Sequence, residues 1–328
     1  MEKSLDRKLA RIRQGSYTPA DFIIADAKDG DMGGGITAFG PKADDSGHCR
    51  SFPEHLDAMR HVTGTGLVDV MLMSASAAER LGAEGVFADS PVTPAARLND
   101  ATDIWGPRHS GYRKSPAQDF RTPRLKSLAS VVDLGLYSIT FSNDLASDVA
   151  FQNGFHRFLD DLSGSGIRYF LEVFNPQIDI GIAPERIPDF VNDCIVRCLA
   201  GLTEADRPQF LKIQFNGPRA MEEICRYDPG HLVVGVLGGG AGTTRDTLEL
   251  VRQSEKYGAR VALFGRKILF SEDPEQTLRT MRAVVEGDLS TEEAVKAYHA
   301  HLAAKGVSPK RSLEDDLEVT EPALMRDV

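Results

Sequence analysis

Short apolar runs rich in β-branched and aromatic residues alternate along the chain with longer stretches whose apolar residues recur at helical spacing. One example is the run 209–215, "QFLKIQF", in which Leu211, Ile213 and Phe215 alternate with polar residues and are expected to share one face of a strand. Eight such runs predict strands, at 22–26, 67–73, 100–105, 131–140, 168–174, 209–215, 232–238 and 260–265.

Helical patterns fill most of the intervals between these runs. The third crossover is the exception, because Pro, Arg and Ser dominate residues 106–130 and leave no clear helical period. A short amphipathic helix is expected near the start of the chain, with Leu5, Leu9 and Ile12 on one face. The remaining helices are predicted at 53–64, 75–83, 145–163, 187–201, 217–226, 243–257, 273–286 and 290–304.

Alternating strands and helices imply parallel strands that are joined by helical crossovers. Eight such units predict a closed (β/α)8 barrel, the TIM-barrel architecture, and a doubly wound open sheet is the alternative. We expect one barrel domain over residues 1–328, with an extra N-terminal helix within 1–17 and a C-terminal helical extension. The acidic tail at 306–328 is expected to be loosely ordered.

The charge and the cysteines narrow the class of protein. The net charge is −10 and the pI is about 5.3, whereas a nucleic-acid-binding protein usually carries a basic surface. No apolar run is long enough for a membrane span, and the charged N-terminus lacks the apolar stretch of a signal peptide. The four cysteines and the histidines lack zinc-ligand spacing, so we expect a cytoplasmic, metal-independent protein with free thiols.

The carboxyl ends of the strands form the active site of such a barrel, and strand 209–215 places a lysine there. Because alternate residues face opposite sides, Lys212 and Gln214 are expected to face the barrel axis, as is Glu172 on the preceding strand. One interpretation of Lys212 and Glu172 is a structural buried ion pair. The other is a catalytic pair, in which a desolvated lysine attacks a carbonyl to form a Schiff base and Glu172 or Tyr137 moves the protons.

The other strand ends supply candidates for binding the substrate. Glycines follow the seventh and eighth strands, and the seventh is followed by a helix whose cap is expected at Thr243 or Thr244, so backbone N–H groups there can bind an anion. Lys28 is either a second phosphate ligand or a solvated charge. The candidates at these ends are Asp26, Lys28, Ser74, Gly238, Gly239, Gly240, Gly265 and Arg266.

The loop at 106–126 carries a cluster of basic residues in an otherwise acidic chain. It is either a solvated or subunit-contacting loop, or a lid whose cations close over an anionic substrate. In the second case Arg113 would bind the substrate and His109 would assist proton transfer.

Several stretches resemble one family of enzymes. "FLK" at 210–212, "GGGAGTT" at 238–244 and "FGRKILFSEDPEQTLRTMRAVVEG" from Phe264 are similar to the class I aldolases of the DhnA and LacD type, which include archaeal-type fructose-1,6-bisphosphate aldolase and tagatose-1,6-bisphosphate aldolase. Gly265–Pro274 resembles the "GR-[NK]-I-F-x-x-E-D-P" pattern of the DhnA type, and "FLEVF" resembles the LacD-type strand that carries a proton-shuttling glutamate. The resemblance is specific over about residues 165–290.

The resemblance implies a TIM barrel that needs no metal or cofactor and forms a homo-oligomer. It implies that Lys212 forms the Schiff base, that Asp26 assists, and that Gly239, Gly240, Gly265 and Arg266 bind phosphate. Archaeal-type members carry an acid/base tyrosine late on the fourth strand, whereas Tyr137 lies earlier on its strand. This difference favours Glu172 over Tyr137 as the acid/base residue.

These features favour a lyase that cleaves a carbon–carbon bond in a phosphorylated or otherwise anionic ketose, or a related keto acid. Its partner would be that small sugar-phosphate-like substrate, with no nucleic acid and no membrane involved. A thiolase-like acyl transfer on the same lysine is one alternative. A non-catalytic barrel that binds a sugar phosphate is the other.

Overall fold

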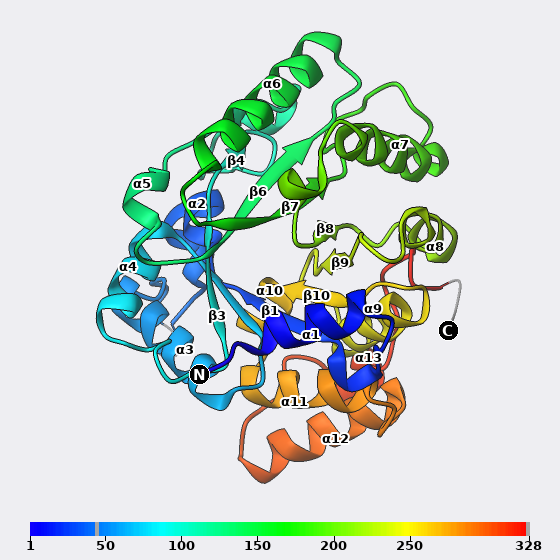
Figure 1. Cartoon of the computed structure of the whole chain (residues 1–328). Helices are drawn as coiled ribbons and strands as arrows, with labels where there is room; N and C mark the ends of the chain where they lie inside the picture. The colour runs from blue at the N-terminus through cyan, green and yellow to red at the C-terminus, as the bar shows by residue number, and fades with distance from the viewer. Residues whose placement is uncertain (43–45, 326–328) are drawn as a thin grey trace.

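A computed structural model describes residues 1–42 and 46–325, and the tail residues 326–328 lie outside this part. Eight parallel strands form a closed barrel in the order β1-β10-β9-β8-β7-β6-β3-β2, surrounded by helices (Figure 1). The predicted TIM barrel is therefore confirmed. The barrel strands are β1 (Ile23–Ala27), β2 (Val70–Met73), β3 (Thr93–Arg97), β6 (Leu134–Thr140), β7 (Arg168–Phe174), β8 (Leu211–Ile213), β9 (Val234–Leu237) and β10 (Val261–Phe264).

The third barrel strand differs from the prediction. It is β3, which pairs with β2 and β6, whereas the predicted strand 100–105 holds only the two-residue β4 (Asp100–Ala101) followed by a turn. β4 pairs antiparallel with β5 (Asp119–Phe120) in a small hairpin outside the barrel. The sequence of β3, "TPAAR", has little intrinsic strand preference, and its pairing with two neighbouring strands decides its conformation.

The predicted helices are present within one or two residues at each end. They are α1 (Ser4–Arg13), α3 (Phe52–Thr65), α4 (Ala75–Ala83), α6 (Leu145–Leu162), α7 (Ile187–Ala200), α8 (Pro218–Tyr227), α9 (Thr244–Lys256), α11 (Pro274–Val285) and α12 (Thr291–Ala304). Four short helices were not predicted: α2 (Gly30–Gly34), α5 (Leu125–Leu128), α10 (Arg266–Leu269) and α13 (Leu313–Asp316). Among the described residues no helix has the length and hydropathy of a membrane span.

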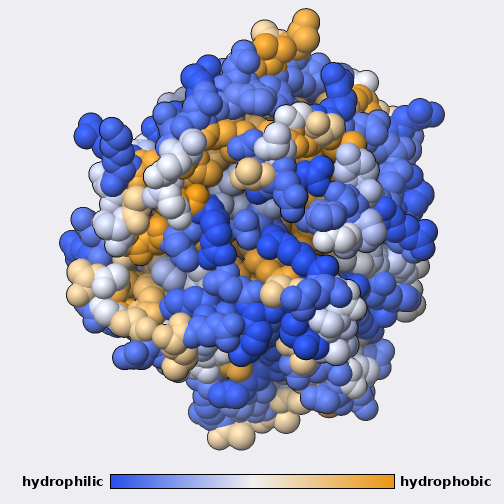
Figure 2. All heavy atoms as spheres, viewed as in Figure 1, coloured by the Kyte–Doolittle hydropathy of each residue, from blue (hydrophilic) through white to orange (hydrophobic). Residues whose placement is uncertain are grey.

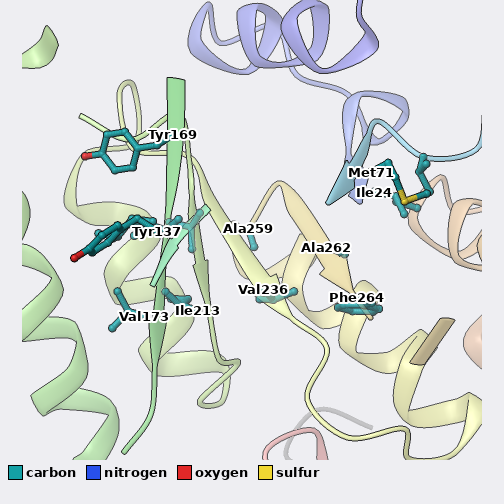
Figure 3. Packing of buried hydrophobic residues seen from close by; sticks show 14 of the residues in the cluster. Ile24, Met71, Tyr137, Tyr169, Val173, Ile213, Val236, Ala259, Ala262 and Phe264 are labelled. Atoms are coloured by element: carbon teal, nitrogen blue, oxygen red, sulfur yellow. The ribbon is translucent and has the colours of Figure 1, made fainter. Parts of the chain in front are cut away.

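The buried apolar residues form two layers, and these fix which way each strand residue points. One cluster fills the barrel interior and includes Leu136, Phe170 and Phe210. The other lies between the strands and the helices and includes Leu211 and Ile213 (Figure 3). The odd-numbered residues of β8 therefore face the helices, and Lys212 faces the interior, as the alternation predicts.

Helix α1 closes the amino-terminal end of the barrel. Leu5 and Leu9 belong to the interior cluster, and Nζ of Lys8 donates hydrogen bonds to the Phe22 carbonyl (3.0 Å) and to the Asp69 carboxylate (3.0 Å). Figure 1 shows α1 crossing in front of the strands, and Figure 2 shows a mostly hydrophilic surface on this face, with hydrophobic residues in its middle and at its upper edge. Because α1 closes this end of the barrel, a substrate can enter at the opposite end, where the strands have their carboxyl ends.

The C-terminal tail is not loosely ordered within the described residues, in contrast to the prediction. The Asp246 carboxylate accepts hydrogen bonds from the backbone N–H groups of Thr320 (2.7 Å) and Glu321 (3.1 Å), and Nε2 of Gln253 donates to the Leu324 carbonyl (2.8 Å). Leu324 is buried. The tail is therefore fastened to α9 by polar contacts that its acidic, weakly periodic sequence does not reveal.

Candidate active site

Lys212 and Glu172 lie side by side in the barrel interior. They are partners in the register of β7 and β8, and Nζ of Lys212 is 2.5 Å from Oε1 of Glu172. Both side chains are almost completely buried. An inward lysine within hydrogen-bond reach of a carboxylate matches the pairing of nucleophile and base that amine catalysis uses.

The second carboxylate oxygen of Glu172 is held by two further strands. Oε2 accepts hydrogen bonds from Nη2 of Arg97 (3.1 Å) and from Oγ of Ser138 (2.8 Å). Arg97 ends β3 and Ser138 lies on β6, so four neighbouring strands converge on one carboxylate. Glu172 is therefore fixed in orientation by charge-assisted hydrogen bonds.

Arg97 extends this network to two aspartates. Its Nε atom lies 2.5 Å from Oδ2 of Asp29, and its Nη1 atom lies 3.8 Å from Oδ1 of Asp100. Burial raises the pKa of Asp29, but the charges of Arg97 and Lys212 outweigh it and lower the pKa below the usual value. Burial raises the pKa of Asp100 to about 6 despite Arg97. Two carboxyls of different proton affinity thus flank one guanidinium.

Asp26 and Lys28 form a second buried ion pair, at the end of β1. Nζ of Lys28 is 2.6 Å from Oδ2 of Asp26, and both side chains are at most 1% exposed. Burial raises the pKa of Asp26, and Lys28 opposes the rise. The interpretation of Lys28 as a solvated charge is wrong, and its ammonium group is engaged by Asp26 in this structure.

Tyr137 is not brought to the site. It lies on the helix-facing side of β6, where its ring packs against Phe155 and Phe158 of α6 (Figure 3). The pKa of its phenol is raised, first by burial and then by the nearby Asp119. Because side chains alternate along β6, Ser138 faces the barrel interior and Tyr137 does not. Tyr137, predicted as an alternative proton shuttle, is therefore a core residue.

The glycine loop after β9 lies at the same end of the barrel as Lys212. A Cβ on Gly238 would meet the Phe264 ring at 3.0 Å, and Gly239 has a positive φ of 66° that favours glycine. Gly240 follows and is exposed. The loop backbone is therefore close-packed at one end and accessible to a ligand at the other.

The start of α9 is not free to bind an anion. The backbone N–H of Thr243 donates to Oδ2 of Asp246 (2.9 Å), and that of Thr244 donates to Oδ1 of Asp316 (2.7 Å). The predicted anion site at this helix cap is therefore filled by carboxylates of the chain itself. An anion in this region is left with the loop at 239–241 and the start of α10.

Gly265 and Arg266 lie between β10 and α10. A Cβ on Gly265 would meet the Ala27 carbonyl at 2.8 Å, so only glycine fits there, and Arg266 is exposed. The next residue, Lys267, has a fully buried side chain whose Nζ atom is 2.7 Å from Oε1 of Glu321 in the tail. The exposed cation of this loop is thus Arg266, and the buried one is already paired.

Ser74 and Gln214, two further residues predicted to bind the substrate, differ in their exposure to solvent. Ser74 is buried at the end of β2, where it precedes α4. Gln214 lies one residue beyond β8 and is exposed. Both lie at the carboxyl ends of their strands, as predicted.

Residues 106–118 of the basic loop lie in the connection of the β4–β5 hairpin, and the rest includes and follows β5. His109 is exposed with a positive φ of 68°, and Nη2 of Arg113 donates to the Ile104 carbonyl (3.2 Å). The Trp105 ring stacks on Tyr112 with centroids 4.9 Å apart, and the Gly106 N–H donates to the Gly33 carbonyl (2.8 Å). The loop therefore has its own aromatic support beside α2, and neither basic residue contacts the Lys212 pair.

The sequence interpretation missed four residues of this network: Arg97, Ser138, Asp29 and Asp100. Arg97 was hidden because the third strand was predicted at 100–105, seven residues after the observed start of β3 at Thr93. Ser138 could have been found from its alternation with Leu136, which faces the interior. Across residues 1–42 and 46–325, no group of three or more His, Cys, Asp or Glu residues is arranged to hold a metal ion.

No protein-family model and no curated protein matches the sequence. Solved structures with a similar fold include an archaeal fructose-1,6-bisphosphate aldolase, with a TM-score of 0.60 and 18% identity over 86% of this chain and 99% of that one. The chain has the fold of this aldolase. An archaeal aldolase with its catalytic lysine bound to the carbinolamine intermediate is also similar, with a TM-score of 0.59, 18% identity and the same coverage.

A third structure with a similar fold is Cgl0159 from Corynebacterium glutamicum. Its TM-score is 0.56, and the identity is 16% over 88% of this chain and 99% of that one. At these identities the likeness concerns the fold of nearly the whole chain, so the chemistry has to be argued from the side chains.

Proposed function

We propose that this protein is a class I aldolase, a lyase that cleaves or forms a carbon–carbon bond through a Schiff base on Lys212. The observation that carries the proposal is the position of Lys212, buried on the interior face of β8 with Nζ 2.5 Å from the Glu172 carboxylate. The fold it shares with Schiff-base-forming aldolases supports the proposal.

Glu172 is proposed as the acid/base for the nitrogen. An amine attacks a carbonyl only when it is neutral, and a carboxylate at hydrogen-bond distance can accept the ammonium proton as substrate enters. The same carboxylic acid can then protonate the carbinolamine hydroxyl, so that water leaves and the iminium forms. Arg97 and Ser138 hold Glu172 in place during both transfers.

The substrate is proposed to be a phosphorylated or otherwise anionic ketose, or a related keto acid. Gly238, Gly239, Gly240, Gly265 and Arg266 would bind its anionic group through backbone N–H groups and one guanidinium. Ser74 and Gln214 would bind hydroxyls at the other strand ends, Asp26 would assist the chemistry, and the loop that carries His109 and Arg113 would close over the substrate. No step of this scheme requires a metal, and we expect a cytoplasmic homo-oligomer.

The test is chemical trapping of the Schiff base. Borohydride is added to the protein together with phosphorylated ketoses, fructose 1,6-bisphosphate included, and the modified peptide is identified by mass spectrometry. We expect a reduced adduct on Lys212 in the native protein, no adduct in Lys212→Met, and turnover that survives chelators. An adduct elsewhere, or none with any reactive ketose, would contradict the proposal.

A further inference from the structure

Asp100 carries a buried carboxylate oxygen that has no partner among the described residues. The side chain is 1% exposed, and Oδ1 accepts the backbone N–H of Ala101 (2.8 Å), whereas Oδ2 accepts no hydrogen bond. An unsatisfied buried carboxylate oxygen is costly, so it calls for a physical reason, and a catalytic role is one such reason.

Gly33 of α2 brings no side chain to this oxygen. A Cβ built on Gly33 would have Oδ2 of Asp100 as its nearest heavy atom, at 4.0 Å. A side chain at this position of α2 would lie beside Oδ2, and glycine adds none. The carboxyl group is thus buried, with the Gly33 backbone rather than a side chain next to Oδ2.

Asp100 also belongs to the network around the proposed Schiff-base lysine. Arg97 lies 3.8 Å from Asp100 and 3.1 Å from Glu172, which in turn contacts Lys212. The charged groups that face Asp100 are Arg97 on β3, Asp29 before α2 and Glu172 on β7. The Arg97 guanidinium therefore links Asp100 to Glu172, the carboxylate that contacts Lys212.

The aldol step needs a base for the substrate hydroxyl, in addition to the proton transfers at the nitrogen. Cleavage starts when a hydroxyl two carbons from the iminium carbon loses its proton. Both carboxylate oxygens of Glu172 already have partners. Oε1 contacts Lys212, and Oε2 accepts hydrogen bonds from Arg97 and Ser138. Tyr137 faces the helices. Asp29 is held by Arg97 and has a lowered pKa, which makes it a weak base.

We propose that Asp100 is the catalytic base that takes the hydroxyl proton through Oδ2 during carbon–carbon cleavage, while Glu172 serves the nitrogen. This inference rests on the proposed aldolase function. The hydroxyl O–H bond breaks and its proton moves to Oδ2. The oxygen becomes the carbonyl of the departing aldehyde, and the electron pair of the broken carbon–carbon bond moves through the iminium to give the enamine. In the reverse direction Asp100 returns the proton to the new hydroxyl.

The proton affinity of Asp100 suits this role. Burial raises its pKa to about 6, closer to neutrality than an ordinary carboxyl, so it is a stronger base while still ionised at neutral pH. Asp103 offers a matched control. It is also buried with a pKa raised by burial to about 6 and a partnerless Oδ2, but its side chain bonds to Thr140 at 3.4 Å and contacts neither Arg97 nor Glu172 among the described residues.

The experiment compares Asp100→Asn with Asp103→Asn in two assays on the whole protein. The first is borohydride trapping with a phosphorylated ketose, and the second is the pH profile of cleavage of the same ketose. For Asp100→Asn we expect the wild-type yield of adduct on Lys212, a fall in kcat of about 100-fold or more, and loss of the acidic limb near pH 6. For Asp103→Asn we expect an unchanged profile.

The possible results of these two assays separate the role of Asp100 from the aldolase function itself. If the wild type traps on Lys212 and Asp100→Asn turns over like the wild type, the role of Asp100 is wrong and the aldolase function stands. If Asp103→Asn loses the acidic limb instead, the base is Asp103. No adduct on Lys212 in the wild type would overturn the aldolase function and this inference with it.

Discussion

Nη2 of Arg97 lies 3.1 Å from Oε2 of Glu172, so the carboxylate that faces Lys212 is anchored by a guanidinium from two strands away in the barrel. Both side chains are buried, and the same guanidinium also pairs with Asp29. The geometry of the proposed catalytic pair therefore depends on a residue that touches Glu172 and not the lysine.

The first prediction concerns Arg97→Met. Removing the guanidinium leaves the buried Asp29 carboxylate without its hydrogen-bonded partner and takes one of two cations from Glu172, which keeps Lys212, so we expect a loss of about 3–5 kcal/mol in the free energy of unfolding. Urea denaturation measures this loss. Arg60→Met is the control, because Arg60 pairs with Glu84 and Asp57 on the surface and should cost less than about 1 kcal/mol. Equal losses in the two variants would contradict the role of Arg97.

The second prediction concerns the pH dependence of stability at Asp100. Its pKa is about 6 in the folded protein and about 3.9 in an unfolded chain, so the folded state holds the proton more tightly. Stability is therefore lost as the pH rises from about 4 to 6, by up to about 3 kcal/mol. Asp100→Asn removes this penalty. We expect the variant to gain stability relative to the wild type between pH 4 and pH 7, measured by denaturation at several pH values, and a constant difference would exclude the raised pKa.

The third prediction concerns the tail contact between Glu321 and Lys267. The Lys267 side chain is fully buried, so Glu321→Gln leaves a buried ammonium without its carboxylate partner. We expect a lower melting temperature and a destabilisation of about 3 kcal/mol. Glu314→Gln changes an exposed glutamate in the same tail and should leave the melting temperature unchanged. A melting temperature for Glu321→Gln that matches the control would show that the tail contact is dispensable.

The fourth prediction separates the two ends of the barrel. Leu5 of α1 is fully buried in the interior cluster, so Leu5→Ala should cost about 2–5 kcal/mol of stability through lost burial and a cavity. The proposed active site is at the opposite end, so kcat of the folded protein at low temperature should stay near the wild-type value. Leu145→Ala, at a side chain that is 82% exposed, is the control and should change stability by less than about 0.5 kcal/mol. A large loss of kcat in Leu5→Ala at a temperature where it is fully folded would contradict this separation.

The sequence by itself determined the repeating architecture and the inward phase of Lys212 and Glu172. Both follow from local patterns: seven of the eight strands carry their own apolar run, and the alternation of β8 puts Leu211 and Ile213 under the helices. The same reasoning applied to β6 would have placed Ser138 inside and Tyr137 outside.

Only the tertiary structure decided which polar groups meet. β3 is a strand because β2 and β6 flank it, and its weak local signal concealed Arg97. The N–H groups at the start of α9 are occupied by Asp246 and by Asp316 from the tail, a contact between residues 72 positions apart. Alternation tells which way a side chain points, whereas its partner depends on strand order and chain crossings that no local pattern encodes.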